Sequence, residues 1–65
     1  MNMLNERQIK FIEAKLTDFA TEYEDSRNRE FKERCRGYCH GVTYVLSEIG
    51  YSVIWNNGKA TIEKV

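Results

Sequence analysis

The sequence predicts an α+β protein, an antiparallel two-helix hairpin followed by a C-terminal two-stranded antiparallel β-hairpin. Two long stretches repeat apolar side chains every three or four residues, which is the period of one helix face. A third stretch near the C-terminus alternates apolar and polar residues around an Asn-Gly pair, as β-hairpins do. We expect a single domain, 1–65, with helices at about 5–24 and about 28–49 and the β-hairpin at about 51–64.

Each predicted helix carries one apolar stripe, with spacings that alternate between three and four residues. A stripe of this kind marks the face that a helix buries against a neighbour. The stripe of the first helix consists of Ile9, Ile12, Leu16, Phe19 and Tyr23. The stripe of the second consists of Phe31, Cys35, Tyr38, Val42, Val45 and Ile49.

The two stripes are mirror images about Arg27, as the layers of an antiparallel helical hairpin require. Phe19 then faces Cys35, and Leu16 faces Tyr38. One continuous helix would put the second stripe out of phase with the first. The chain is therefore expected to double back near Arg27.

The turn and capping residues at the fold-back point are Asp25, Ser26 and Asn28, with Ser26 or Asn28 as the N-cap of the second helix. One observation favours a different arrangement. Acidic residues end the first helix and basic residues begin the second, and both oppose the helix macrodipole. Pairs such as Asp25 and Arg29 would also suit an unbroken helix. A single long helix, swapped across a dimer, therefore remains an alternative.

The second helix is expected to end at Gly50, a C′ glycine, with Tyr51 folding back on Leu46. A two-residue turn at Asn57-Gly58 then joins the strands. The turn pairs Trp55 with Ala60 and Val53 with Ile62. One face of the ribbon then covers the helices, and it consists of Tyr51, Val53, Trp55, Ala60 and Ile62. Both edges of such a ribbon are open, so it could pair with the ribbon of a second copy.

Size and charge exclude several function classes. A chain of 65 residues buries a small core, and dimerisation is the expected stabiliser. No apolar run approaches the length of a membrane span, and the N-terminus does not resemble a signal peptide, so we expect a cytoplasmic protein with reduced thiols. The net charge is zero, which argues against generic binding to nucleic acid or membrane.

The charges are nevertheless distributed unevenly. Residues 1–25 hold three basic and six acidic side chains, whereas residues 27–36 hold five basic and two acidic ones. A basic run with interleaved acids is usually a solvated, salt-bridged face. The alternative is contact with phosphate or another anion through Arg27, Arg29, Lys32, Arg34 and Arg36.

The segment RCRGYCHG, residues 34–41, could hold a metal, a disulfide or a nucleophile. A structural zinc ion needs four ligands, and the chain has no second cysteine pair. Helical geometry at this spacing fits a disulfide between Cys35 and Cys39 poorly. A thiolate with His40 as its base remains an alternative. The favoured interpretation is that both cysteines are small core residues, and no metal or cofactor is expected.

Two glycines within the second helix need an explanation, because each costs about 1 kcal/mol relative to alanine. Gly37 and Gly41 fall on one flank of the helix, in line with Tyr44. Small residues four apart allow another backbone to approach closely. We expect an interface with a second subunit or partner here, to which Leu4, Phe11 and Ile54 also contribute. The alternative is that the β-hairpin or the N-terminal segment of the same chain lies on this flank.

The ending LSEIGYSVIWNNGKATIEK, which follows a helix that bears cysteines and glycines, resembles small uncharacterised proteins encoded by phages and prophages of Gram-positive bacteria. The resemblance covers the second half of the chain and consists mainly of the GYxVxW…GKATI run. It implies a host-cell cytoplasmic setting and a small regulator or inhibitor that binds host proteins, as anti-CRISPR proteins do. It supplies no catalytic or binding residues.

The first hypothesis is a non-enzymatic, dimeric interaction protein that occupies a surface of a host or phage protein. The alternative is a small nucleic-acid-binding regulator that uses the basic region Arg27–Arg36. An enzyme or metal protein built on Cys35, Cys39 and His40 is the third hypothesis.

Overall fold

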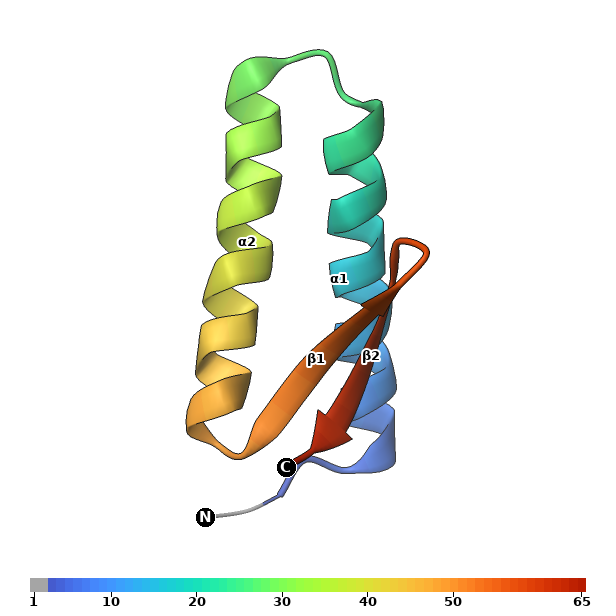
Figure 1. The fold of residues 1–65 in the computed structure, drawn as a ribbon, viewed down its shortest axis with the longest axis vertical. Coiled ribbons are helices and arrows are strands. Elements are labelled where there is room, and N and C mark those ends of the chain that lie inside the picture. Colours follow the sequence, from blue (N-terminus) through green and yellow to red (C-terminus); the bar gives the residue numbers. More distant parts are fainter. Residues whose placement is uncertain (1–2) are drawn as a thin grey trace.

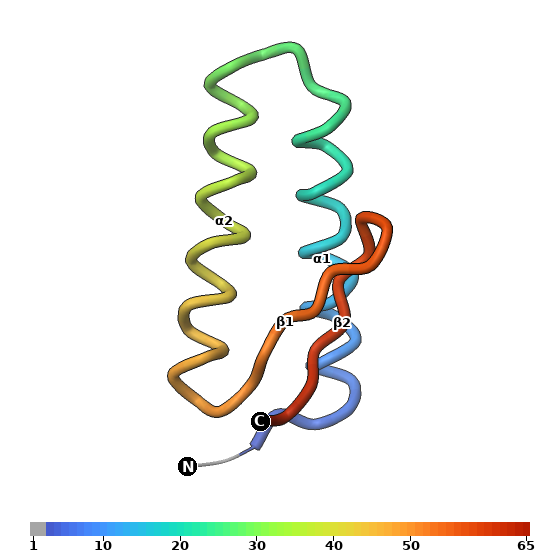
Figure 2. The backbone as a smooth tube through the Cα atoms, in the orientation of Figure 1, coloured from blue at the N-terminus to red at the C-terminus, as the bar shows by residue number. Residues whose placement is uncertain are grey.

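The computed structural model describes residues 3–65, and it has the predicted order of elements. Helix α1 (Glu6–Asp25) and helix α2 (Arg29–Glu48) form an antiparallel hairpin, and strands β1 (Tyr51–Asn56) and β2 (Lys59–Lys64) form an antiparallel ribbon (Figure 1). The tube view shows the ribbon beside the half of the helical hairpin that is farthest from the α1–α2 turn (Figure 2). The helical hairpin and the C-terminal β-hairpin are both confirmed.

Local capping residues determine where the helices begin and end. At the start of α1, the side chain of Asn5 accepts a hydrogen bond from the Gln8 N–H at 2.8 Å, and the Gln8 side chain accepts one from the Asn5 N–H at 2.9 Å. This reciprocal pair is a capping box. Asn28 is the N-cap of α2, and its side chain accepts from the Phe31 N–H at 2.9 Å. Ser26 is the C-cap of α1, so the chain reverses within residues 26–28.

The ribbon also has the predicted ends and register. Gly50 has a φ of +91°, which glycine adopts without steric penalty after a helix. Asn57 and Gly58 have φ values of +53° and +79°, so the turn has positive φ at both central positions. Trp55 pairs with Ala60, as expected. Val53 likewise pairs with Ile62.

The hydrophobic core lies between the helices and the ribbon. It is built around Leu16, which is 1% exposed, together with Leu46, Tyr51, Ala60 and Ile62. Tyr51 packs in the same cluster as Leu46, as the helix-end prediction requires. The Tyr51 hydroxyl also accepts a hydrogen bond from the backbone N–H of Leu4 at 3.1 Å, which ties the N-terminal segment to the ribbon. No buried polar or charged residue occurs among residues 3–65.

Two side chains of α1 fasten β2 to the helices. The Ala60 N–H donates to Thr17 Oγ1 at 3.0 Å, and the Ile62 N–H donates to Glu13 Oε2 at 2.7 Å. The spacings match, because residues four apart in a helix and two apart in a strand are each about 6–7 Å apart along their axes. The acceptors on α1 are therefore in register with alternate donors on β2.

The predicted pairing of helix layers was wrong by a few residues. Phe19 stacks on Tyr38 with a centroid distance of 4.9 Å, and Cys35 lies beside Glu22. Helical side chains tilt toward the N-terminus of their own helix. In an antiparallel pair that tilt is opposite in the two helices, so each residue meets a partner farther along the chain than simple mirror symmetry predicts.

The prediction that Trp55 belongs to the core was also wrong, because its side chain is 43% exposed. A strand of six residues is about 20 Å long, whereas a helix of 20 residues is about 30 Å long. The ribbon therefore covers only part of the helical hairpin. Trp55 lies near its tip, where its ring borders two hollows beside α2 and is left partly uncovered.

Candidate functional site

An apolar groove runs along the side of the helical hairpin that faces away from the ribbon. Phe11, Lys15 and Phe19 lie about 200° around α1 from Glu13 and Thr17, the residues that hold β2. No residue of the ribbon lines the groove, which has a volume of about 720 Å³. We call this surface the open helix face. It is lined by Leu4, Phe11, Ile12, Lys15, Leu16, Phe19, Gly37, Tyr38, Gly41, Val42, Val45, Leu46 and Ile49.

The open helix face has both protruding and recessed positions. Phe11 is 63% exposed, Val45 58% and Tyr38 51%, and all three line the same groove, so they form one apolar patch of the kind that marks contact sites. Beside them, Gly37 and Gly41 form the recess. A Cβ added at either glycine would meet no atom within 4 Å. The face therefore combines apolar projections with a hollow on the helix surface.

Among residues 3–65, Lys15 is the one charged residue that lines this face, and it does not make the face polar. Its ammonium lies 5.6 Å from the centroid of the Phe11 ring, in the arrangement of a cation–π contact. The aliphatic stem of such a lysine can lie along apolar surface while its charge stays in water. The remaining lining offers a partner apolar contact and almost no hydrogen-bonding groups.

The structure brings four of the six predicted interface residues together. Leu4, Phe11, Gly37 and Gly41 all line the open helix face. Two others lie elsewhere. Tyr44 borders a smaller hollow together with His40 and Trp55, and Ile54 is on the ribbon face opposite Val53 and Trp55. The N-terminal segment reaches the glycine flank through Leu4, whereas the β-hairpin does not.

Sequence reasoning did not assign the other nine lining residues to this face, and Phe19, Tyr38 and Val45 are three of them. All three were assigned to the seam between the helices because they continue its stripe. A usable signal existed, since Phe11 widens the apolar sector of α1 beyond what contact with one neighbouring helix requires. The extra width corresponds to the second, uncovered side.

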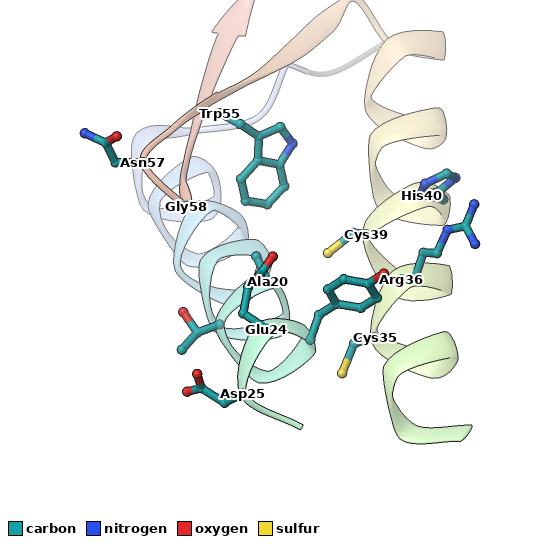
Figure 3. A pocket seen from close by; sticks show the side chains of 12 residues that line it. Ala20, Glu24, Asp25, Cys35, Arg36, Cys39, His40, Trp55, Asn57 and Gly58 are labelled. Carbon is teal, nitrogen blue, oxygen red and sulfur yellow. The ribbon is translucent and has the colours of Figure 1, made fainter. Parts of the chain in front are cut away.

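The two cysteines lie at the other side of the helical hairpin, in a hollow of about 550 Å³ near the ribbon tip (Figure 3). Cys35 is buried, and its sulfur lies 4.0 Å from Glu22 Oε2. The Cys39 sulfur lies 3.9 Å from the carbonyl oxygen of Leu16. Both thiols are thus positioned as weak donors toward α1.

This geometry gives no support to a reactive thiol. Burial raises the pKa of the Cys39 thiol, and the neighbouring Cys35 adds a smaller upward contribution. A nucleophilic cysteine needs the opposite shift. The His40 ring points away from both sulfurs (Figure 3), so it does not serve as their base. Residues 3–65 contain no cluster of three or more His, Cys, Asp or Glu side chains that could hold a metal ion.

The basic run of α2 is largely free of ion pairs. Within residues 3–65 the single salt bridge joins Arg36 to Glu33, at 3.8 Å and with both side chains exposed. Lys32 instead lies over the Tyr23 ring, 5.0 Å from its centroid. The solvated face expected for this run is therefore salt-bridged at one pair alone within residues 3–65. Exposed pairs contribute only about 0–1 kcal/mol, so little drives further pairs to form.

Within residues 3–65, neither helix has a stretch apolar and long enough to cross a lipid bilayer. No protein-family model, no curated protein and no solved structure matches the chain.

Proposed function

We propose that the chain is a non-enzymatic protein-interaction protein that dimerises through the open helix face and acts by binding another protein of the host cell or of a phage. The observation that carries the proposal is the uncovered apolar side of the helical hairpin, where exposed Phe11 and Val45 flank the recess at Gly41. Apolar surface of this kind is stabilised when a partner removes it from water.

The exposed area supports a partner of ordinary size. The accessible surface of the chain is 5268 Å², whereas a compact monomer of 7.7 kDa exposes about 4,300 Å². Part of the surplus reflects the elongated outline, which measures 39 × 19 × 17 Å. Two helices about 30 Å long and about 10 Å apart present a face of roughly 600 Å². Two such faces together reach about 1,200 Å², the lower end of the range for specific interfaces.

A second copy of the chain is the occupant that fits this face. A two-fold interface brings the same patch of both protomers together, so each patch must supply both projections and recesses. Phe11 and Tyr38 project, and Gly37 and Gly41 are recessed, within one groove. Two helical hairpins packed in this way form a four-helix core with the ribbons on its outer sides.

The oligomeric state tests the proposal. We expect the mass from light scattering to rise from one protomer to two as concentration increases, and Val45→Glu to hold the protein at one protomer, because it places a carboxylate in the apolar contact. Tyr44→Glu is the matched control, since Tyr44 is 68% exposed but lies outside the groove. A wild type that stays monomeric at high concentration, or equal effects of the two substitutions, would contradict dimerisation through this face.

Nucleic-acid binding is the second candidate, and the unpaired basic side chains favour it. Arg29, Lys32 and Arg36 fall on one flank of α2 by helical periodicity, and only Arg36 takes part in a salt bridge within residues 3–65. The zero net charge argues against this function. Reversing the three charges should abolish any salt-dependent retention on DNA or RNA. If the wild type is not retained at low salt, this candidate is eliminated.

A further inference from the structure

The two edges of the ribbon differ in their hydrogen bonding. Asn56 and Lys59 flank the two-residue turn and form a hydrogen-bonded pair, so the next residues on each strand form a non-hydrogen-bonded pair. In such pairs the N–H and C=O groups point away from the partner strand. The outward-pointing groups on β2 therefore include those of Ala60 and Ile62, and on β1 those of Val53 and Trp55.

The edge of β2 is closed by the protein itself. Its outward N–H groups at Ala60 and Ile62 donate to Thr17 and Glu13 of α1. An exposed strand edge is a template for further pairing, and proteins commonly protect it with side chains or helices. In β2 this protection comes from the side chains of α1, so this edge cannot accept another strand.

The edge of β1 has no such protection. No group within residues 3–65 accepts a hydrogen bond from the N–H of Val53 or Trp55. With their carbonyls, these two residues present four outward-pointing backbone groups, two donors and two acceptors. The prediction that both edges are open was therefore wrong for β2, and it holds for β1 alone.

Open space lies beside the Trp55 end of this edge, and Val53 does not line it. A hollow of about 430 Å³ lies between Trp55 and the α2 side chains His40, Thr43, Tyr44 and Ser47. It adjoins the larger hollow near the ribbon tip, which Trp55 also lines (Figure 3). Within the described part of the chain, the lining of the smaller hollow contains no carboxylate and no lysine or arginine. Its floor therefore matches a segment whose inward side chains are small and uncharged.

We propose that the free edge of β1 accepts an extended, uncharged segment of a partner protein as a third, antiparallel strand. This inference rests on the proposed function, and it names the class of partner and the place of contact. The main-chain groups of Val53 and Trp55 supply binding, and the α2 side chains beneath select small inward side chains. A second copy of the chain fits this edge less well. If its β1 paired with the β1 of the first copy, its α2 would occupy the space above the α2 of the first copy.

The probe is a capped hexapeptide of alternating threonine and valine, with N-methyl groups along one edge only. The methyl groups block self-association and leave the other edge able to pair. In amide NMR spectra of the labelled protein, we expect shifts and slower hydrogen exchange at Val53 and Trp55. The amides of Ala60 and Ile62 serve as the internal control, because α1 already occupies them.

Two further comparisons separate edge pairing from other kinds of binding. Val53→Pro removes an outward N–H without removing a bond of the ladder, and it should weaken peptide binding at least tenfold, whereas Val53→Ala should retain it. A peptide methylated along both edges should not bind the wild type. This comparison does not depend on whether the proline variant folds. Equal shifts with that peptide, or no change at Val53 and Trp55 with the first one, would overturn the proposal.

The same measurements distinguish this inference from dimerisation. Val45→Glu should lose dimerisation and still bind the peptide, because Val45 lies on the opposite side of the helices. If Val53 and Trp55 become protected when protein concentration rises without peptide, the occupant is a second copy. That result would overturn the assignment to a partner segment.

Discussion

Replacing Gly37 and Gly41 by alanine should have opposite effects on the protomer and on the dimer. Both glycines lie within α2, neither has a positive φ, and an added Cβ would meet no atom within 4 Å. Each substitution therefore gains the helix propensity of alanine without a steric cost in the protomer. That gain is about 0.8–1.0 kcal/mol at each site.

For the double variant, the free energy of unfolding of the protomer should rise by about 2 kcal/mol. In a domain of this size, that corresponds to an increase in Tm of roughly 8–16 °C. The dimer should respond in the other direction, because two protomers together place four methyl groups in the recesses that the partner occupies. We expect the dissociation constant of the dimer to rise at least tenfold, equivalent to about 1.4 kcal/mol.

Urea unfolding over a roughly hundredfold range of protein concentration separates the two effects, since only the dimer term depends on concentration. Gly50→Ala is the matched control. Gly50 has a φ of +91°, so alanine there should destabilise the protomer. If the double variant is less stable than the wild type at low concentration, the conclusion that the protomer has room for a Cβ at both glycines is wrong. If its dimer is as tight as that of the wild type, the glycines do not face the second copy.

Three further predictions concern the core, the thiols and the ribbon edge. Leu16→Ala should cost about 2–5 kcal/mol of the roughly 3–10 kcal/mol available to a chain of this length, and circular dichroism should show it largely unfolded on mild heating. Burial raises the pKa of the Cys39 thiol above its ordinary value of 9.0, so the folded state keeps this proton at pH values where the unfolded chain has lost it. The urea midpoint of unfolding should therefore fall as the pH rises past about 9. The fall should be less steep in Cys39→Ala, which has no thiol at this position. Glu13→Ala should cost about 1–2 kcal/mol and speed hydrogen exchange at Ile62, with the Thr61 amide, which pairs with Ile54, as the unaffected control.

The parts of the fold that local chemistry determines could be predicted from the sequence. Asn57-Gly58 gave the turn and the register because few other pairs adopt positive φ at both positions. Asn28 and Gly50 gave the helix ends for similar reasons, since a cap bonds groups within a few residues of itself. Each of these signals needs only neighbouring residues, so a single sequence contains all of it.

The remaining features depend on how far one element extends over another. The apolar stripes do not indicate which side of the helices the ribbon covers, and so Tyr38 and Val45 were assigned to the seam although they lie on the open helix face. The closure of the β2 edge was not predictable either. Glu13 and Thr17 are ordinary polar helix residues, and their role appears only when β2 is placed beside them.

The two proposed surfaces lie on opposite sides of the helices, which leads to a last prediction about avidity. A dimer joined through the open helix face would present two β1 edges at once, each with its own Val53 and Trp55 groups. Two copies of the probe peptide joined by a flexible linker should then bind the wild type roughly 10²–10⁴-fold more tightly than one copy, provided that the linker spans both edges. With Val45→Glu, the tandem and single peptides should bind about equally, because each protomer offers one edge. A tandem advantage that persists in this variant would mean that the second peptide contacts another part of the same protomer.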